Sequence, residues 1–183
     1  MSYAYNMGQY YHPIILSSDG KILVWMLAHS YNNGLKLMEH SYIGNNFVST
    51  FEFGLSPEGP HYKTRVVWAG DYADNEPGQA TNLHSQCTEY SMIYPAEKLT
   101  TNYRFLVNHT KKQFVDKSKV PDSDGRMIHP LPLLTAEGNG CGGGDYYSDS
   151  ADACPLVGSW ARDVISVEET APEGFDELAF DLV

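Results

Sequence analysis

Short apolar runs separated by turn-forming residues dominate the hydrophobic pattern of the chain. The runs KILVWMLA (21–28), TRVVWAG (64–70) and RDVISVE (162–168) have the length of strands and are rich in β-branched residues. A turn signal at 32–34 separates the first run from LKLMEHSY (35–42). We therefore expect 21–28 and 35–42 to pair as a β-hairpin.

The middle of the chain adds a second hairpin and two ambiguous segments. Residues 103–107 and 113–117 flank a polar turn and predict two paired strands. Residues 45–54 fit a short helix that an asparagine caps and a glycine ends, although their phenylalanines also alternate as in a strand. The two prolines of HPLPLLT (129–135) predict an edge strand or an irregular buried segment.

These elements predict an α+β fold, a single sheet-dominated mixed domain over residues 1–183 with a few short helices. The 183 residues match the usual length of one domain, and 42% of them are hydrophobic. The thirteen tyrosines also favour a sheet. Residues 170–183 are rich in acids and contain no basic residue, so we expect a solvated tail or a short docked helix there.

Charge and cysteine content restrict the partners and the location. The net charge of −11 opposes non-specific binding to nucleic acid, and a protein partner could instead meet the acidic surface. No apolar run reaches the roughly 20 residues that span a bilayer, so we expect no membrane contact. The N-terminus has no secretory signal, and three cysteines suit a reducing, cytoplasmic location. The sequence leaves open whether Cys141 and Cys154 pair.

The stretch GNGCGGGDYYSDSADAC (138–154) is the first candidate ligand site. Successive glycines can turn their amides inward and let a ligand approach the backbone closely. The stretch lacks the Gly-Lys-Ser/Thr of a P-loop, the strand and helix of a dinucleotide fingerprint and the acid spacing of a calcium loop. A solvated connecting loop is an equal alternative. The candidate ligand-binding residues here are His129, Glu137, Asn139, Gly140, Gly142, Gly143, Gly144 and Asp145.

The end of the run 64–70 is the second candidate. Asp71 directly follows this strand, and an acid at a strand end is a common position for functional groups. Asp74 lies on the same loop, while Trp68 and Tyr72 could stack on a base or a sugar. The simpler alternative is that Asp71 caps the turn with its own side chain.

The third candidate is the pair Glu39 and His40, which together with Asp71 and His129 could form an acid–base or metal-assisted set. Neighbouring residues on a strand point to opposite faces, so one of the pair is expected to be structural. The sequence has no HExxH and no GxSxG motif, and it identifies neither a cofactor nor a metal.

Three functions are compatible with these candidates. The first is a small intracellular protein that binds a small polar ligand, such as a nucleotide or a sugar derivative, through the Gly-rich stretch and the Asp71 strand end. The second is a small hydrolase or transferase that uses Glu39 or His40 with Asp71. The third is a non-catalytic acidic interaction protein. Whether the chain is an enzyme is left open by the sequence.

Overall fold

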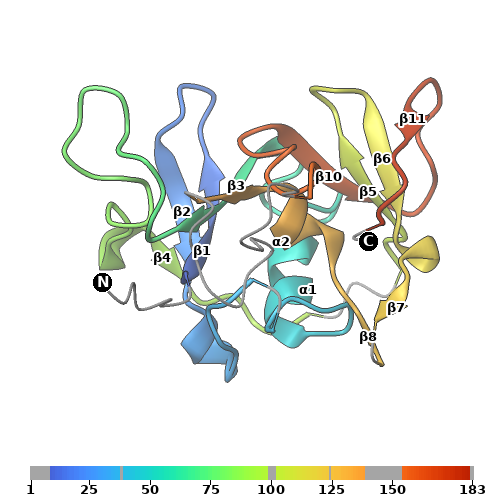
Figure 1. Ribbon diagram of the computed structural model, residues 1–183, viewed down its shortest axis with the longest axis horizontal. Helices are drawn as coiled ribbons and strands as arrows, with labels where there is room; N and C mark the ends of the chain where they lie inside the picture. The colour runs from blue at the N-terminus through green and yellow to red at the C-terminus, as the bar shows by residue number, and fades with distance from the viewer. Residues whose placement is uncertain (1–8, 38, 99–101, 124, 139–153, 182–183) are drawn as a thin grey trace, which may run out of the picture.

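The computed structural model describes residues 9–37, 39–98, 102–123, 125–138 and 154–181. A mixed sheet of nine strands forms most of it, and two α-helices lie against one face of this sheet (Figure 1). The predicted α+β class with a dominant sheet is confirmed.

The strands of the large sheet lie in the order β11-β6-β5-β10-β3-β1-β2-β4, and β9 pairs separately with β3. Their bounds are β1 Tyr11–Leu16, β2 Ile22–Met26, β3 Thr64–Gly70, β4 Met92–Ile93, β5 Phe105–Asn108, β6 Gln113–Asp116, β9 Ala136–Glu137, β10 Val164–Glu168 and β11 Asp176–Glu177. A separate two-stranded sheet pairs β7 (Asp122–Ser123) with β8 (Arg126–Met127). The helices are α1 (Asn46–Gly54) and α2 (Pro130–Leu134), with 3-10 turns η1 (Ala28–Tyr31), η2 (Glu89–Ser91) and η3 (Lys117–Lys119).

The first hairpin differs from the one predicted. β2 pairs with β1, which precedes it, while residues 35–37 and 39–41 form turns and bends and Tyr42 makes a single bridge to Ile128. The backbone amide of Ser17 donates to the carbonyl of Lys21 at 2.9 Å, and Gly20 takes φ +82°, so the turn at 17–20 closes this hairpin. Pro13 is tolerated within β1 because β2 pairs with that strand only from Ile14 onward.

Both α-helices begin with a side-chain cap. Asn45 Oδ1 accepts from the amide of Val48 at 3.1 Å, which confirms the predicted helix. The segment predicted to be an edge strand or irregular is α2, where His129 Nδ1 accepts from the amide of Leu131 at 3.1 Å. The prolines fit this helix because its first turn needs no intrahelical amide donors.

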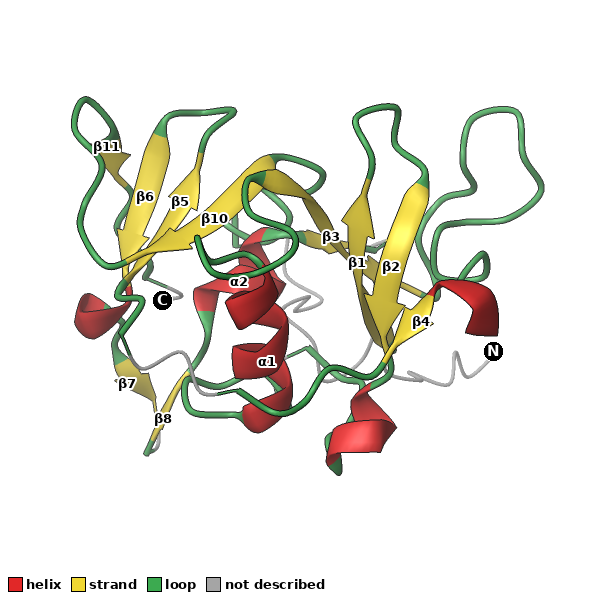
Figure 2. Ribbon diagram, turned by 180° about the vertical axis from the view of Figure 1, so that it is seen from behind, coloured by secondary structure: helices red, strands yellow, loops and turns green. Residues whose placement is uncertain are grey.

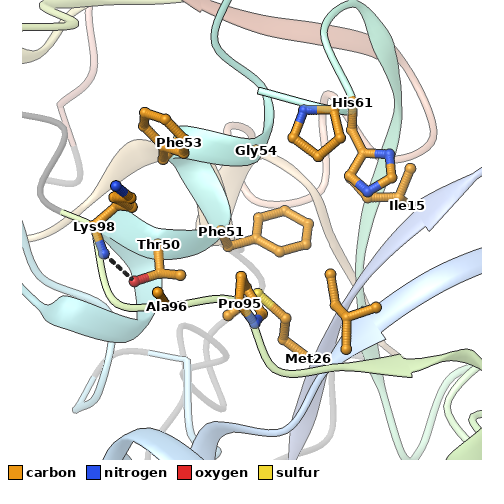
Figure 3. Close-up of a pocket in the computed structure, with 12 residues that line it drawn as sticks. Ile15, Met26, Thr50, Phe51, Phe53, Gly54, His61, Pro95, Ala96 and Lys98 are labelled. Atoms are coloured by element: carbon orange, nitrogen blue, oxygen red, sulfur yellow. Dashed lines mark hydrogen bonds between the residues drawn. The ribbon is translucent and has the colours of Figure 1, made fainter. Parts of the chain in front are cut away.

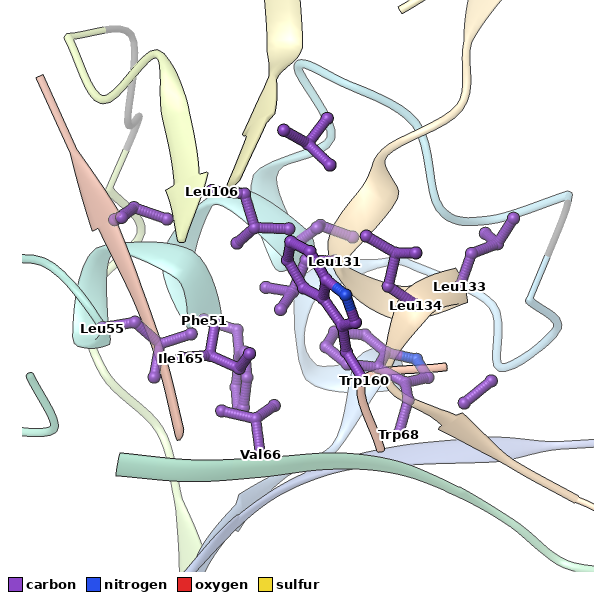
Figure 4. Close-up of a cluster of buried hydrophobic side chains, with 14 of the residues drawn as sticks. Phe51, Leu55, Val66, Trp68, Leu106, Leu131, Leu133, Leu134, Trp160 and Ile165 are labelled. Atoms are coloured by element: carbon purple, nitrogen blue, oxygen red, sulfur yellow. The ribbon is translucent and has the colours of Figure 1, made fainter. Parts of the chain in front are cut away.

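Apolar side chains cover both faces of the central strands. The larger core lies between the sheet and the helices, where Trp68, Phe51, Leu131 and Trp160 pack together (Figure 4). On the other face, residues 71–91 cover a second, smaller core. This long connection from β3 to β4 is the green loop at the left of Figure 1, and Figure 2 shows it from behind.

Candidate functional site

An apolar pocket of about 150 Å³ lies beside α1 (Figure 3). Thr50, Phe51 and Gly54 form its helical wall. Ile15 of β1 and Met26 of β2 form the wall that belongs to the sheet. The surface lining the pocket is almost entirely carbon, so it favours an apolar occupant.

The third wall is an extended segment, residues 93–98, which we call the pocket strap. Three hydrogen bonds fasten the strap to the rest of the fold. Tyr31 Oη donates to the carbonyl of Pro95 at 2.8 Å, and the amide of Lys98 donates to Thr50 Oγ1 at 3.0 Å. Asn46 Nδ2 donates to Glu97 Oε2 at 2.8 Å. Side chains of α1 and η1 thus hold the strap, and with it the third wall of the pocket, in place.

Two side chains with nitrogen groups stand at the pocket. Lys98 is exposed, and its ammonium lies 5.6 Å from the centre of the Phe53 ring. His61 is half-buried, and burial lowers its pKa, so its imidazole is neutral at pH 7. The pocket lining therefore combines apolar side chains with one positively charged side chain, that of Lys98.

The Asp71 side chain binds a backbone amide that is distant in the sequence. Its Oδ1 accepts from the amide of Tyr10 at 3.0 Å, and its own amide donates to the carbonyl of Tyr10 at 3.0 Å. Trp68 is buried in the main core, where its ring meets Phe51 edge-on at 5.2 Å. Tyr72 and Asp74 are exposed on the loop that follows, so two of the four candidates at this strand end face solvent.

Glu39 and His40 have partners of their own. The Glu39 carboxylate pairs with the ammonium of Lys36 at 3.1 Å, and His40 Nδ1 accepts from the Lys36 amide at 3.2 Å. The His40 ring also packs so closely on Gly34 that a Cβ there would lie 2.2 Å from it. No hydrogen bond or ion pair links either residue to Asp71 in the part of the chain that the structure describes.

His129 lies in the core and not at the surface. Its Nε2 is 3.3 Å from Oε1 of Glu52, which also pairs with the ammonium of Lys117, and all three side chains are at least nine-tenths buried. Burial lowers the pKa of His129. Burial alone would raise the pKa of Glu52, but the charge of Lys117 and the contact with His129 lower it to about 2. This buried ion cluster joins α1, η3 and α2.

The described start of the Gly-rich stretch lies beside the end of β3. β9 runs parallel to β3, and Glu137 pairs with Arg162, which also binds Glu76 of the loop after Asp71. Gly138 packs so tightly that a Cβ there would lie 2.3 Å from Oε1 of Gln9. The lack of space for a side chain therefore explains why a glycine occupies position 138. The other candidates, Asn139, Gly140, Gly142, Gly143, Gly144 and Asp145, lie outside the described residues.

The sequence did not reveal the pocket. Its walls come from β1, β2, α1, the loop residues Pro60 and His61, and the strap, and none of these segments carries a recognisable ligand motif. The one usable signal was the helix predicted at 45–54, whose buried side places Phe51 toward the sheet.

Comparisons with known proteins return no relative for this chain: no family model, no curated protein and no solved structure matches it. Within the described segments, His, Cys, Asp and Glu side chains form no group of three or more that could hold a metal ion. Nor do these segments contain a helix long and apolar enough to cross a membrane.

Proposed function

We propose that this chain is a binding module that takes the apolar part of a small molecule into the pocket beside α1. The observation that carries the proposal is an apolar pocket of about 150 Å³ with walls from five separate segments. A cavity of about this size in another protein binds benzene. A six-membered ring or a short branched alkyl group is therefore the expected occupant.

The small lining residues support a pocket that is kept open. Thr50, Gly54 and Ala96 all line it, and a larger apolar side chain at any of these positions would fill it. Empty apolar volume in a core costs about 24 cal/mol per Å³, so an unused pocket would gain stability by being filled. The presence of three small side chains in the lining fits a pocket that serves a ligand.

Binding of neutral ring compounds tests the proposal. The full chain is titrated with benzene and benzyl alcohol, and binding is followed by ligand-observed NMR and by thermal unfolding. A ligand at a hundredfold excess over its Kd should stabilise the fold by about 2.7 kcal/mol. Ala96→Phe should abolish binding, whereas Tyr94→Phe, a strap substitution outside the lining, should preserve it. If neither compound nor any small carboxylic acid binds the wild-type chain, the proposal is wrong.

A polar-ligand site at the Asp71 strand end is a second candidate. The observation in its favour is that β9 brings Glu137 and Gly138 beside Gly70, so the Gly-rich stretch starts next to this strand end. A thermal-shift screen with nucleotides and sugar phosphates tests it. Any stabilisation should be lost in Asp74→Ala and kept in Ala96→Phe. The hydrolase or transferase alternative gains no support from the separate partners of Glu39 and His40.

We also propose a cytoplasmic location. Cys87 and Cys154 carry free thiols, which persist in reducing compartments. Burial raises the pKa of Cys87 to about 12, so this thiol is protonated and unreactive at neutral pH. A protein partner for the acidic surface remains a prediction.

A further inference from the structure

We infer that the natural ligand of the pocket is a small aromatic or short-chain carboxylic acid whose carboxylate meets the ammonium of Lys98. This inference rests on the proposed function, because it names the class of molecule that the same pocket takes. The apolar interior would hold the ring or the alkyl group, and the acid group would stay at the mouth.

The first observation is that Lys98 has no acidic partner among the residues that the structure describes. Several basic residues share this property, but Lys98 is the one among them that lines the pocket. Arg104 and Lys119 each bind a carboxylate. No carboxylate contacts Lys98 within the described residues, and the neighbouring Glu97 is occupied by Asn46.

The second observation is the position of the charge. The Lys98 backbone is fixed to Thr50 of α1, and its ammonium lies over the ring of Phe53, another residue of the pocket lining (Figure 3). Thr50 is buried, and its hydroxyl accepts from Lys98 while keeping its own hydrogen. A carboxylate at the mouth could accept from this hydroxyl and from the ammonium together.

The charge of the rest of the lining is consistent with an acid. Lys98 is the one residue of the lining with a charge at neutral pH, since His61 is neutral there. A cationic ligand would be repelled by Lys98, and a neutral ligand would leave the ammonium without a partner. The lining thus selects for negative charge at one end of an apolar body.

The test compares matched ligands and matched lysines in the full chain. Benzoate, phenylacetate and hexanoate are compared with their neutral amides by calorimetry and NMR. Each acid should bind at least about tenfold more tightly than its amide, and added salt should weaken only the acids. Lys98→Met should remove this preference without changing amide binding. Lys63→Met is the control, because Lys63 also lies over an aromatic ring without an acidic partner but outside this pocket.

The outcomes separate the two proposals. If the amides bind as tightly as the acids, or if Lys98→Met leaves the preference intact, the acid inference is overturned while ligand binding by the pocket stands. If neither acids nor amides bind, and benzene does not bind either, both proposals fail. Acid binding that survives Ala96→Phe would place the acids elsewhere and would also overturn the inference.

Discussion

Replacing Lys117 by methionine should destabilise the fold severely, because it leaves a buried carboxylate without its cation. The Lys117 ammonium pairs with Glu52, whose side chain is 1% exposed, while that of Lys117 is 9% exposed. His129, the third member of the cluster, is neutral near pH 7 in the wild type because burial lowers its pKa, so Lys117 supplies the positive charge of the cluster.

The expected loss is about 3–5 kcal/mol at pH 7, the usual effect of removing one partner of a buried ion pair. Lys119→Met is the matched control within the same 3-10 turn. Lys119 also pairs with a carboxylate, that of Glu177, but its side chain is 60% exposed. Loss of such a surface pair should cost about 0–1 kcal/mol.

The pH dependence gives a second readout. In the wild type, the pKa of Glu52 is lowered to about 2, so its contribution is full above about pH 4.5 and is lost as the pH falls toward 2. Without Lys117, burial raises the pKa of Glu52, and protonation then relieves the unpaired charge. The penalty of Lys117→Met should therefore shrink between pH 7 and pH 5.

Urea unfolding followed by tryptophan fluorescence at pH 7 and pH 5 measures both effects. The double variant Glu52→Gln with Lys117→Met should be more stable than Lys117→Met alone, since it removes the buried charge as well. The reasoning is refuted if Lys117→Met and Lys119→Met lie within 1 kcal/mol of each other at pH 7, or if the double variant is the less stable.

Three further substitutions test other contacts. Gly59→Ala would place a Cβ 2.3 Å from the carbonyl oxygen of Phe53, so we expect a loss of about 1–3 kcal/mol in urea unfolding, and an unchanged midpoint would contradict this. Burial and then the charge of the stacked His84 ring lower the pKa of His12 to about 3, so the free energy of unfolding should fall below about pH 6.5 by up to about 1.4 kcal/mol per pH unit. His12→Phe should reduce this slope in denaturation series from pH 7 to pH 4, and a slope equal to that of the wild type would argue against the reasoning. Arg162→Lys loses the paired bonds to two carboxylates and should cost about 1–3 kcal/mol by thermal unfolding, whereas a variant as stable as the wild type would show that charge alone suffices.

The strands with strong local patterns could be predicted from the sequence. The bounds of β3 match the predicted run 64–70, and β5 and β6 form the predicted hairpin. These segments are β-rich and end in clear turn residues, so the local signal agrees with the tertiary environment. The helix at 45–54 could also be predicted from a local signal, because Asn45 caps its first turn.

β1 was not predicted and α2 was predicted as another structure, and both segments contain proline. Proline normally argues against a central strand, but Pro13 lies where β2 does not yet pair with β1. The same rule predicted an edge strand or an irregular buried segment for HPLPLLT, while its prolines in fact occupy the first turn of a helix. In both places the outcome depends on neighbours that are distant in the sequence.

The pocket could not be predicted from any single segment of the sequence. Asp71 follows an apolar strand as a functional acid would, yet its carboxylate accepts the amide of Tyr10, 61 residues away. The pocket needs Ile15, Phe51 and Ala96 on three separate segments, and nothing in the sequence shows that these converge. A motif can reveal a site whose residues are close together in the sequence, whereas the residues of this apolar pocket are far apart in it.

The two edge strands of the large sheet affect the tendency of the protein to aggregate in concentrated solution. Each edge strand has only two residues, β4 on one side and β11 on the other. Such short edge strands offer few free backbone groups to a second molecule, and the exposed carboxylate of Asp176 repels a like-charged copy. Edge-to-edge association of the sheets into fibrils is thereby disfavoured.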